Sequence, residues 1–241
     1  MSRNRQSGHV GNLGDIIKHA ALVELAFLLK GRGAPVSFVD THTFRLRAPL
    51  AKPPRFAREL EAHVRSYRAA ERYAEMERAS LLRTGNYRCS SGLVLDVLGE
   101  DRACAVLGEA NGLTRAELRE QLADEGHARV HVVEDASFVD RGGWVPAGGA
   151  VLVHVDPFAL TPAEWDPIAP VLDAIAARAS SAVFVLYRYT RVARIPWPTP
   201  PSGTRFVAEN RGAPHEVAMF ASPDVHASVA EVSQSLGFRV S

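Results

Sequence analysis

Acidic side chains stand at the ends of several apolar runs of this sequence, where each run gives way to polar residues. In chain order these acids are Asp40, Glu109, the pair Glu134 and Asp135, and Asp156. Ligands of open α/β sheets bind beyond the carboxyl ends of the strands, so these positions are where chemistry is expected. A carboxylate there accepts hydrogen bonds from a ribose diol or an ammonium group, whereas a single terminal Asp is common in caps and turns. Four such ends in succession favour a site for a nucleoside ligand.

The strands that present these acids are short, β-branched apolar runs bounded by turn residues. Their apolarity is continuous rather than alternating, which is typical of parallel strands covered by helices on both faces. They are predicted at 34–42, 103–109, 128–135, 149–158 and 181–189. Two later strands, at 204–209 and 214–221, and a helix near 224–236 are expected to complete an antiparallel edge. The sequence therefore predicts an α/β fold.

Helical segments lie between these strands. Residues 13–30 predict a helix that ends at Gly31, because glycine is favoured just after a helix. Its apolar face is expected to contain Ile16, Ala20, Val23 and Phe27. Residues 57–83 are rich in Ala, Glu and Arg, which indicates an exposed helical insertion rather than a core helix. Two more helices are expected, at 113–124 and 162–178.

Length and charge limit the kind of protein. The 241 residues are enough for one large domain with a buried core, and no segment divides the chain as a linker. Lys and Arg number 28 against 27 Asp and Glu, a formal net charge of +1, so no overall positive field indicates nucleic-acid binding. The most basic stretch contains no acid and carries Arg45, Arg47, Lys52, Arg55 and Arg58. It is either a solvated surface, the commoner case, or a site for a polyanion.

Cysteine usage and hydropathy bear on the compartment. Cys89 and Cys104 lie 15 residues apart without a CxxC motif or a companion His spacing, so no metal site is indicated. Two such thiols fit a reducing cytoplasm. No window approaches the 18 apolar residues of a membrane span, and residues 1–12 lack the apolar core of a signal peptide. We therefore expect a cytoplasmic protein without a membrane partner.

A spaced motif lies near the N-terminus. The segment HVGNLGDIIKH, residues 9–19, resembles the N-terminal signature of the bacterial 23S rRNA adenine-N6 methyltransferases of the J type. The resemblance continues in order through 40–42, 86–91, Glu109, 133–136 and 155–158. It implies a class I S-adenosylmethionine (SAM)-dependent methyltransferase fold, a Rossmann-like sheet with helices on both faces. It also implies one domain over 1–241 with a small helical insertion at about 47–86.

The same resemblance implies roles for individual residues. Those matched to SAM contacts are His19, His42, Ser90, Glu109, Asp135 and Ala136. Asp156 is placed at the reaction centre, and Lys18 is expected to support the site electrostatically. From the residues alone, a hydrogen-bonded polar residue on the first helix is the commoner interpretation of His19.

The departures from the family pattern lie on the side of the acceptor. A base-methylating site of this family ends in Asp-Pro-Pro-aromatic, where the acid and a backbone carbonyl receive the N6 hydrogens and the ring stacks on the flipped base. Here Asp156 and Pro157 are followed at once by Phe158. Asn4 stands where the family has a tyrosine, and the loop after the first strand contains no glycine. The residues for SAM are therefore kept, whereas those for the base are changed.

This combination predicts an enzyme that consumes SAM, either as methyl donor to a small molecule or as the substrate itself. In the second case the α-amine of SAM attacks its own γ-carbon, which releases methylthioadenosine and forms azetidine-2-carboxylate. Asp156 and His42 are candidates for the general base. Candidates for holding the sulfonium by cation–π attraction, unless they simply fill the core, are Phe44, Phe158, Tyr187 and Tyr189.

Three alternatives belong to other classes. A 23S rRNA adenine-N6 methyltransferase that tolerates the altered motif would set the basic residues of 45–58 against phosphates, and its binding would weaken steeply with salt. A small-molecule N- or O-methyltransferase would leave a methylated product. A SAM-binding regulator without turnover would leave SAM intact.

Overall fold

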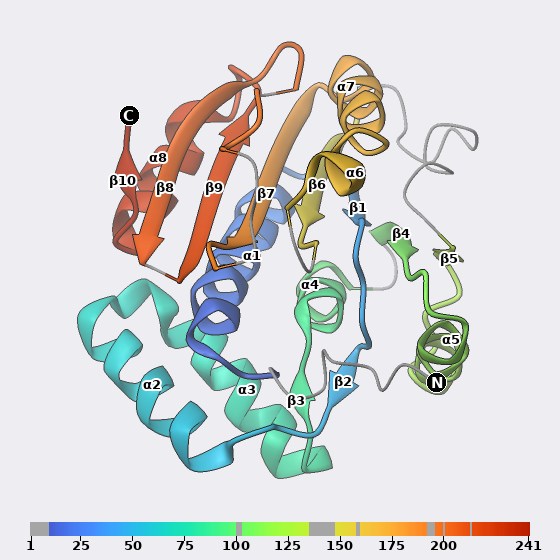
Figure 1. Cartoon of the computed structure of the whole chain (residues 1–241), viewed down its shortest axis with the longest axis vertical. Helices are drawn as coiled ribbons and strands as arrows, with labels where there is room; N and C mark the ends of the chain where they lie inside the picture. Colours follow the sequence, from blue (N-terminus) through green and yellow to red (C-terminus); the bar gives the residue numbers. More distant parts are fainter. Residues whose placement is uncertain are drawn as a thin grey trace.

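An eight-stranded sheet forms the centre of the fold within the residues that the computed structural model describes (Figure 1). Those residues are 10–99, 103–134, 148–157, 160–191, 196–199, 201–212 and 214–241. The strands of the sheet are β1 (Val36–Asp40), β4 (Ala103–Gly108), β5 (Val130–Val133), β6 (Ala150–Val155), β7 (Ser181–Tyr189), β8 (Arg205–Gly212), β9 (His215–Ala221) and β10 (Arg239–Val240). Their order across the sheet is β10-β8-β9-β7-β6-β1-β4-β5.

The sheet reverses its order at β1. From β1 the chain first extends the sheet through β4 and β5, and then returns to add β6 and β7 on the other side, all of them parallel. β9, β8 and β10 continue the sheet as an antiparallel edge. The predicted class I methyltransferase-like sheet is therefore confirmed, while β10 was not predicted. Ligands of such sheets bind at the carboxyl ends of the strands where the order reverses.

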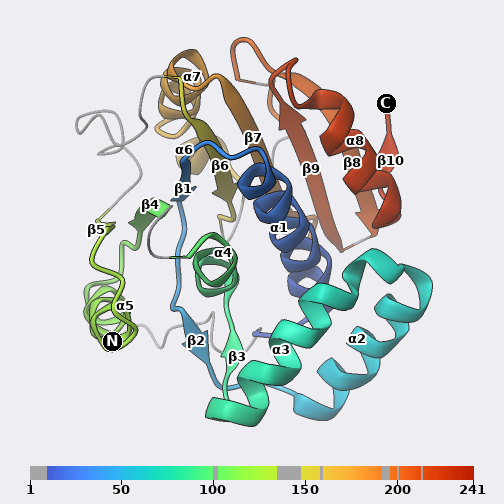
Figure 2. The same cartoon turned by 180° about the vertical axis from the view of Figure 1, so that it is seen from behind.

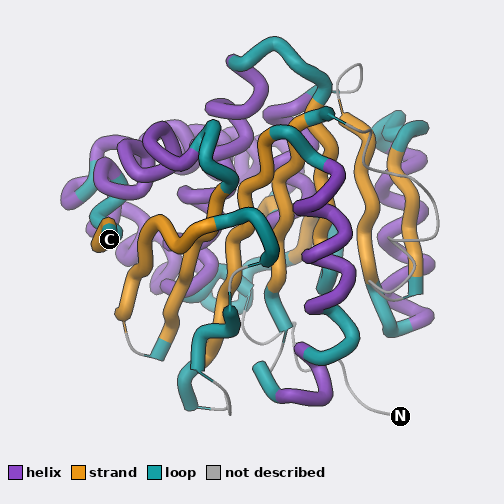
Figure 3. Tube along the Cα trace, turned by 90° about the horizontal axis from the view of Figure 1, so that it is seen from above, coloured by secondary structure: helices purple, strands orange, loops and turns teal. Residues whose placement is uncertain are grey.

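Helices cover both faces of the sheet. α1 (Leu13–Gly31), α4 (Ser90–Leu98) and α8 (His226–Ser235) pack on the face seen in Figure 2. α6 (Pro162–Trp165) and α7 (Ala169–Arg178) pack on the opposite face. α5 (Gly112–Asp124) lies beside β5. Seen from above, the strands run between helices on either side (Figure 3).

Strand β6 separates two cores. Ala150 and Leu152 belong to the buried cluster beneath α1. The alternate residues of the strand belong to the cluster beneath α7, namely Val151, Val153 and Val155. Because side chains alternate along a strand, His154 lies on the α1 side, where it is fully buried. A polar group is thus placed in the core directly before the strand reaches Asp156.

The insertion lies beyond the carboxyl ends of the parallel strands, in the lower part of Figure 1. Its ends meet in the antiparallel hairpin of β2 (Arg47–Ala48) and β3 (Tyr87–Arg88), and between them lie α2 (Pro53–Ser66) and α3 (Glu71–Thr84). The single helix predicted over 57–83 is wrong, because Tyr67 adopts an extended backbone with φ −137° and ψ 96°. A 3₁₀ turn follows before α3 begins.

Two other sequence expectations are corrected, and one helix was missed. α4 was not predicted, although it carries Ser90 in its first turn. The helix expected over 162–178 is divided into α6 and α7. Phe27 was assigned to the apolar face of α1, but it is 36% exposed and lies under the guanidinium of Arg72, 4.3 Å from its ring centroid. α1 is enclosed by the sheet, α3, α4 and α8, so nearly all of its other apolar residues are buried.

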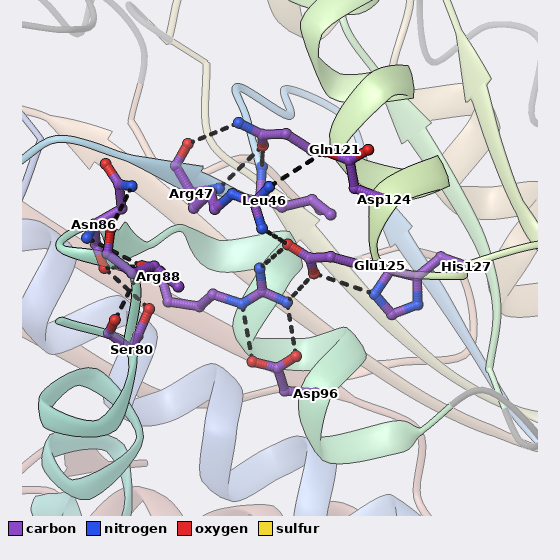
Figure 4. Close-up of polar contacts among 11 residues, drawn as sticks. Leu46, Arg47, Ser80, Asn86, Arg88, Asp96, Gln121, Asp124, Glu125 and His127 are labelled. Carbon is purple, nitrogen blue, oxygen red and sulfur yellow. Dashed lines mark hydrogen bonds and ion pairs between the residues drawn. The ribbon is translucent and has the colours of Figure 1, made fainter. Parts of the chain in front are cut away.

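A buried arginine ties the base of the insertion to the helices beside the sheet (Figure 4). Arg88 of β3 donates to both oxygens of Asp96 on α4, at 2.9 and 2.7 Å, and to both oxygens of Glu125, at 2.8 and 2.6 Å. Glu125 caps the end of α5 and also accepts from Arg47 of β2 at 2.7 Å. Because α4 begins two residues after Arg88, these bonds fix where Ser90 stands.

Candidate functional site

One cavity, of about 520 Å³, lies at the carboxyl ends of β1, β6 and β7. It brings together five of the residues predicted to form the site, namely Lys18, His19, His42, Ser90 and Asp156. α1 supplies the first two, and α2, β9 and the segment after β7 complete the walls. A larger cavity, about 630 Å³, lies between the helices of the insertion, but its lining is mainly apolar and contains none of these residues.

The start of α1 presents a charged pair to this cavity. Asn12 caps the helix by accepting from the backbone N–H of Gly14 and Asp15, while the Asp15 carboxylate returns to the N–H of Gly11 and Asn12. Lys18, one turn later, lies 2.9 Å from Asp15 and also contacts Oδ2 of Asp156. Burial alone would lower the pKa of Lys18, but these two carboxylates raise it well above its usual value. The ammonium is therefore held charged between α1 and the end of β6.

Asp40, the acid at the end of β1, is not among the described residues that line the cavity. It is fully buried, and its oxygens accept from Ser90 Oγ at 3.2 Å, Ser91 Oγ at 2.6 Å and the backbone N–H of His42 at 3.2 Å. The ring of His154 lies 3.3 Å away. Burial acts to raise the pKa of Asp40, but His154 and the hydrogen bonds hold it below its usual value. This carboxylate thus positions the residues that line the cavity.

His42 and His19 enter the cavity with one ring nitrogen already engaged. Nδ1 of His42 lies 2.7 Å from Thr41 Oγ1, and Nδ1 of His19 lies 2.7 Å from the hydroxyl of Tyr87. Tyr87 in turn lies 3.3 Å from the hydroxyl of Tyr73. Burial lowers the pKa of both histidines. Each ring is therefore neutral near pH 7, and its Nε2 has no hydrogen-bond partner among the described residues, which leaves it for a ligand.

Aromatic side chains from β7 and β9 form another part of the lining. The hydroxyl of Tyr187 bonds Nδ1 of His215 at 2.7 Å, and the two rings stack at 6.1 Å between centroids. Tyr189 lies on the same imidazole at 5.3 Å. Lys18 Nζ stands 4.8 Å from the centroid of Tyr187, so this ring faces a cation within the protein. Tyr187, Tyr189 and His215 are hereafter called the aromatic wall.

Of the remaining predicted residues, Phe44 lines the cavity, Glu109 does not, and three lie outside the described residues. Glu109 directly follows β4 and accepts from the N–H of Asn111 at 2.6 Å, but it is not among the described residues that line the cavity. Burial raises the pKa of its carboxyl to about 7. Asp135, Ala136 and Phe158 lie outside the described residues. Phe44 lines the cavity under the guanidinium of Arg45.

Several residues of the site were missed by the sequence reasoning. Ser91, Tyr87 and His154 belong to segments that were singled out, but nothing in their spacing distinguished them from core residues. The alternation of β6 was the available signal for His154, since it shares the α1 side with Leu152. His215 comes from the antiparallel edge, and no motif connects it with residues before 190.

Comparison with solved structures bears on the fold. A Legionella pneumophila protein of the family model DUF519 aligns with a TM-score of 0.66 and 14% identity, over 93% of this chain and 91% of that chain. The chain therefore shares the fold of that protein, and at this identity nothing finer is shown. Two structures of lower similarity are a methyltransferase from Geobacter sulfurreducens (TM-score 0.45, 14% identity, 83% and 77% covered) and an rRNA methylase from Streptococcus thermophilus (0.44, 9%, 85% and 94%). No family model and no curated protein sequence matches the chain.

Two further searches of the structure concern metals and membranes. Among the described residues, no group of three or more His, Cys, Asp or Glu side chains is arranged to hold a metal ion. None of the helices in the described ranges combines the length and the apolar composition that a bilayer crossing requires.

Proposed function

We propose that this protein is a SAM-dependent enzyme whose second substrate is a small molecule bound in the cavity at the ends of β1, β6 and β7. The observation that carries the proposal is the meeting of Lys18, His19, His42, Ser90 and Asp156 around one cavity, beside the strand where the sheet order reverses. Its volume of about 520 Å³ falls within the range of small-molecule sites.

The residues present fit the polar groups of SAM. α4 begins at Ser90, and its cap residue Cys89 makes no side-chain hydrogen bond, so the positive end of this helix is available to a carboxylate. His19 lines the same cavity and has Nε2 left for that carboxylate. Glu109 ends the strand that presents the ribose-binding acid in Rossmann-like folds. When bound, SAM supplies a methyl group that a nitrogen lone pair takes as the methyl–sulfur bond breaks.

Asp156 is suited to orient an amine. Its Oδ2 accepts from Lys18, and in the described part of the chain no donor is found on Oδ1. Oδ1 can therefore accept an N–H of the acceptor and turn the nitrogen lone pair toward the methyl group. Neutral His42 lines the same cavity and can take the proton that the methylated ammonium releases.

The ion pairs of the basic segment favour a small acceptor over rRNA. Arg45 pairs with Glu117, Arg47 with Glu125 and Arg55 with Glu59, so most of the charges between 45 and 58 are matched by carboxylates of the chain itself. A phosphate backbone would have to compete with these carboxylates, and binding driven by released counterions needs free cations.

The first test measures whether SAM binds and what becomes of it. Calorimetry is expected to give micromolar affinity for SAM in the wild type and an affinity at least tenfold lower for His19→Ala. His226→Ala, a histidine whose ring bonds the carbonyl of Phe206 away from the cavity, is the matched control. Asp156→Asn is expected to bind SAM within about threefold of the wild type but to lose turnover by about 100-fold or more.

Mass spectrometry then separates the reactions. S-adenosylhomocysteine formed with a small amine is the expected product. Methylthioadenosine together with azetidine-2-carboxylate from SAM alone would instead identify internal cyclisation. S-adenosylhomocysteine formed only with a 23S rRNA fragment would return the protein to the RNA-methylating class, and failure to bind SAM would overturn the proposal.

A further inference from the structure

The rim of the cavity carries more positive charge than SAM requires. Among the described residues that line it, the cations are Lys18, Lys52, Arg55 and Arg191, against the carboxylates of Asp15 and Asp156. Both of these carboxylates contact Lys18. SAM itself adds a further positive charge, because its sulfonium and ammonium outweigh its single carboxylate. Because both carboxylates of the lining are paired with Lys18, neither neutralises the other three cations.

These three cations are exposed residues of the lining. Lys52 precedes α2, Arg55 is in its first turn, and Arg191 follows β7 two residues after Tyr189. Arg55 bonds Glu59 at 2.7 Å, whereas within the described ranges Lys52 and Arg191 form no ion pair. The first turn of α2 contains no acid and has no side-chain cap, so the helix dipole adds to the positive potential there.

We propose that the acceptor is a planar amine carrying a carboxylate or phosphate group, with the anion held by Lys52 and Arg191 and the ring held against the aromatic wall. The proposal rests on the proposed function, because it assigns the second substrate of the same cavity. The rings of the wall line the same cavity as Asp156, and Lys52 and Arg191 can supply charge-assisted hydrogen bonds at its rim. An anionic acceptor would also offset the positive charge of bound SAM.

Matched pairs of probes test this assignment by calorimetry on the full chain saturated with S-adenosylhomocysteine. The carboxylate pair is 4-aminobenzoate against aniline, and the phosphate pair is 4-aminophenyl phosphate against 4-aminophenol. In at least one pair the anionic member is expected to bind about tenfold more tightly than the neutral member. The pair with the larger difference identifies the anion.

Variants assign that difference to the rim. In the double variant Lys52→Gln, Arg191→Gln the difference is expected to disappear, while the affinity for S-adenosylhomocysteine stays within about threefold. Arg58→Gln, an exposed cation of α2 outside the cavity lining, is the matched control and is expected to keep the difference. Both variants are expected to unfold at the wild-type temperature, because they change exposed side chains.

The outcomes separate the two proposals. If the wild-type protein does not bind S-adenosylhomocysteine, the proposed function itself is overturned. Normal binding of that compound with no gain for either anion, including no binding of any probe, would overturn only the anionic acceptor. A gain that survives in the double variant would also overturn it. The anionic acceptor would also be overturned if neither small pair shows a gain while RNA binds and its affinity falls both in Arg58→Gln and in the double variant. That result would indicate a polyanion as the ligand.

Discussion

Replacing Arg88 by Met is expected to be among the most destabilising single changes in this chain. The side chain is 4% exposed and its guanidinium makes four hydrogen bonds to Asp96 and Glu125, whose side chains are 35% and 18% exposed. Removing one partner of a buried ion pair costs about 3–5 kcal/mol. Because water reaches part of both carboxylates once the cation is gone, we expect a loss of about 2–4 kcal/mol. Met keeps the apolar stem, so the loss reports the ionic contacts.

The assay is urea unfolding followed by circular dichroism, with the slope of the free energy against urea compared between variants. Arg78→Met is the matched control, because Arg78 pairs with Glu71 at 2.9 Å while both side chains are about half exposed, at 50% and 46%. Such exposed pairs contribute less than about 1 kcal/mol. A free energy of unfolding for Arg88→Met within about 1 kcal/mol of the control would refute the reasoning that the cluster is a buried brace.

Two other predictions concern the site and its packing. Burial raises the pKa of Glu109 to about 7, so the ionised fraction of its carboxyl increases as pH rises from 6 to 8. If this carboxylate accepts hydrogen bonds from the ribose hydroxyls, the affinity for SAM measured by calorimetry should increase over that range. The increase should vanish in Glu109→Gln. The same raised pKa means that the folded state binds this proton more tightly than the unfolded state, so its contribution to stability falls as pH rises from about 4.5 to 7. Gly92→Ala should lower the stability of the folded protein in thermal unfolding by about 1–3 kcal/mol, because a Cβ there would lie 2.5 Å from the Leu46 carbonyl oxygen. Gly112→Ala is the control and should be neutral or stabilising, because nothing lies within 4 Å of a Cβ at that position. Equal melting temperatures for the two glycine variants would contradict this account.

The parallel strands could be predicted because they are buried on both faces. The first seven residues of β7, for example, are all buried, so its sequence is a continuous apolar run, which is unusual for an exposed segment. The break at Tyr67 could not be predicted from composition, because no Gly or Pro marks it in the sequence. The short strands β2, β3 and β10 have two residues each, too few to show any periodicity.

The site was predicted in part for the same reason. The end of a buried strand locates an acid, but it does not say whether the carboxylate faces the ligand or the core. Asp156 reaches the cavity, whereas Asp40 is bonded by Ser90, Ser91 and the His42 backbone beneath it. The aromatic wall depends on β9, which joins β7 through antiparallel pairing of residues 26 to 38 positions apart, such as Tyr189 and His215. Local sequence patterns carry no information about that pairing.

The Arg88 cluster connects two elements that line the cavity, α4 and the insertion. On one side it holds Asp96 of α4, the helix whose first turn carries Ser90, and on the other it closes the hairpin from which the insertion brings Lys52 and Arg55. If the cluster were only a brace for the core, Arg88→Met would lower stability and leave both affinities of the folded protein unchanged. The same few hydrogen bonds of Arg88 position both α4 and the insertion at the cavity. Loss of Arg88 should therefore lower the affinity for S-adenosylhomocysteine and the affinity for the anionic probe together. The rim variants, which leave α4 in place, should weaken the probe alone. The contrast between these two patterns distinguishes a residue that positions the whole cavity from residues that contact one ligand within it.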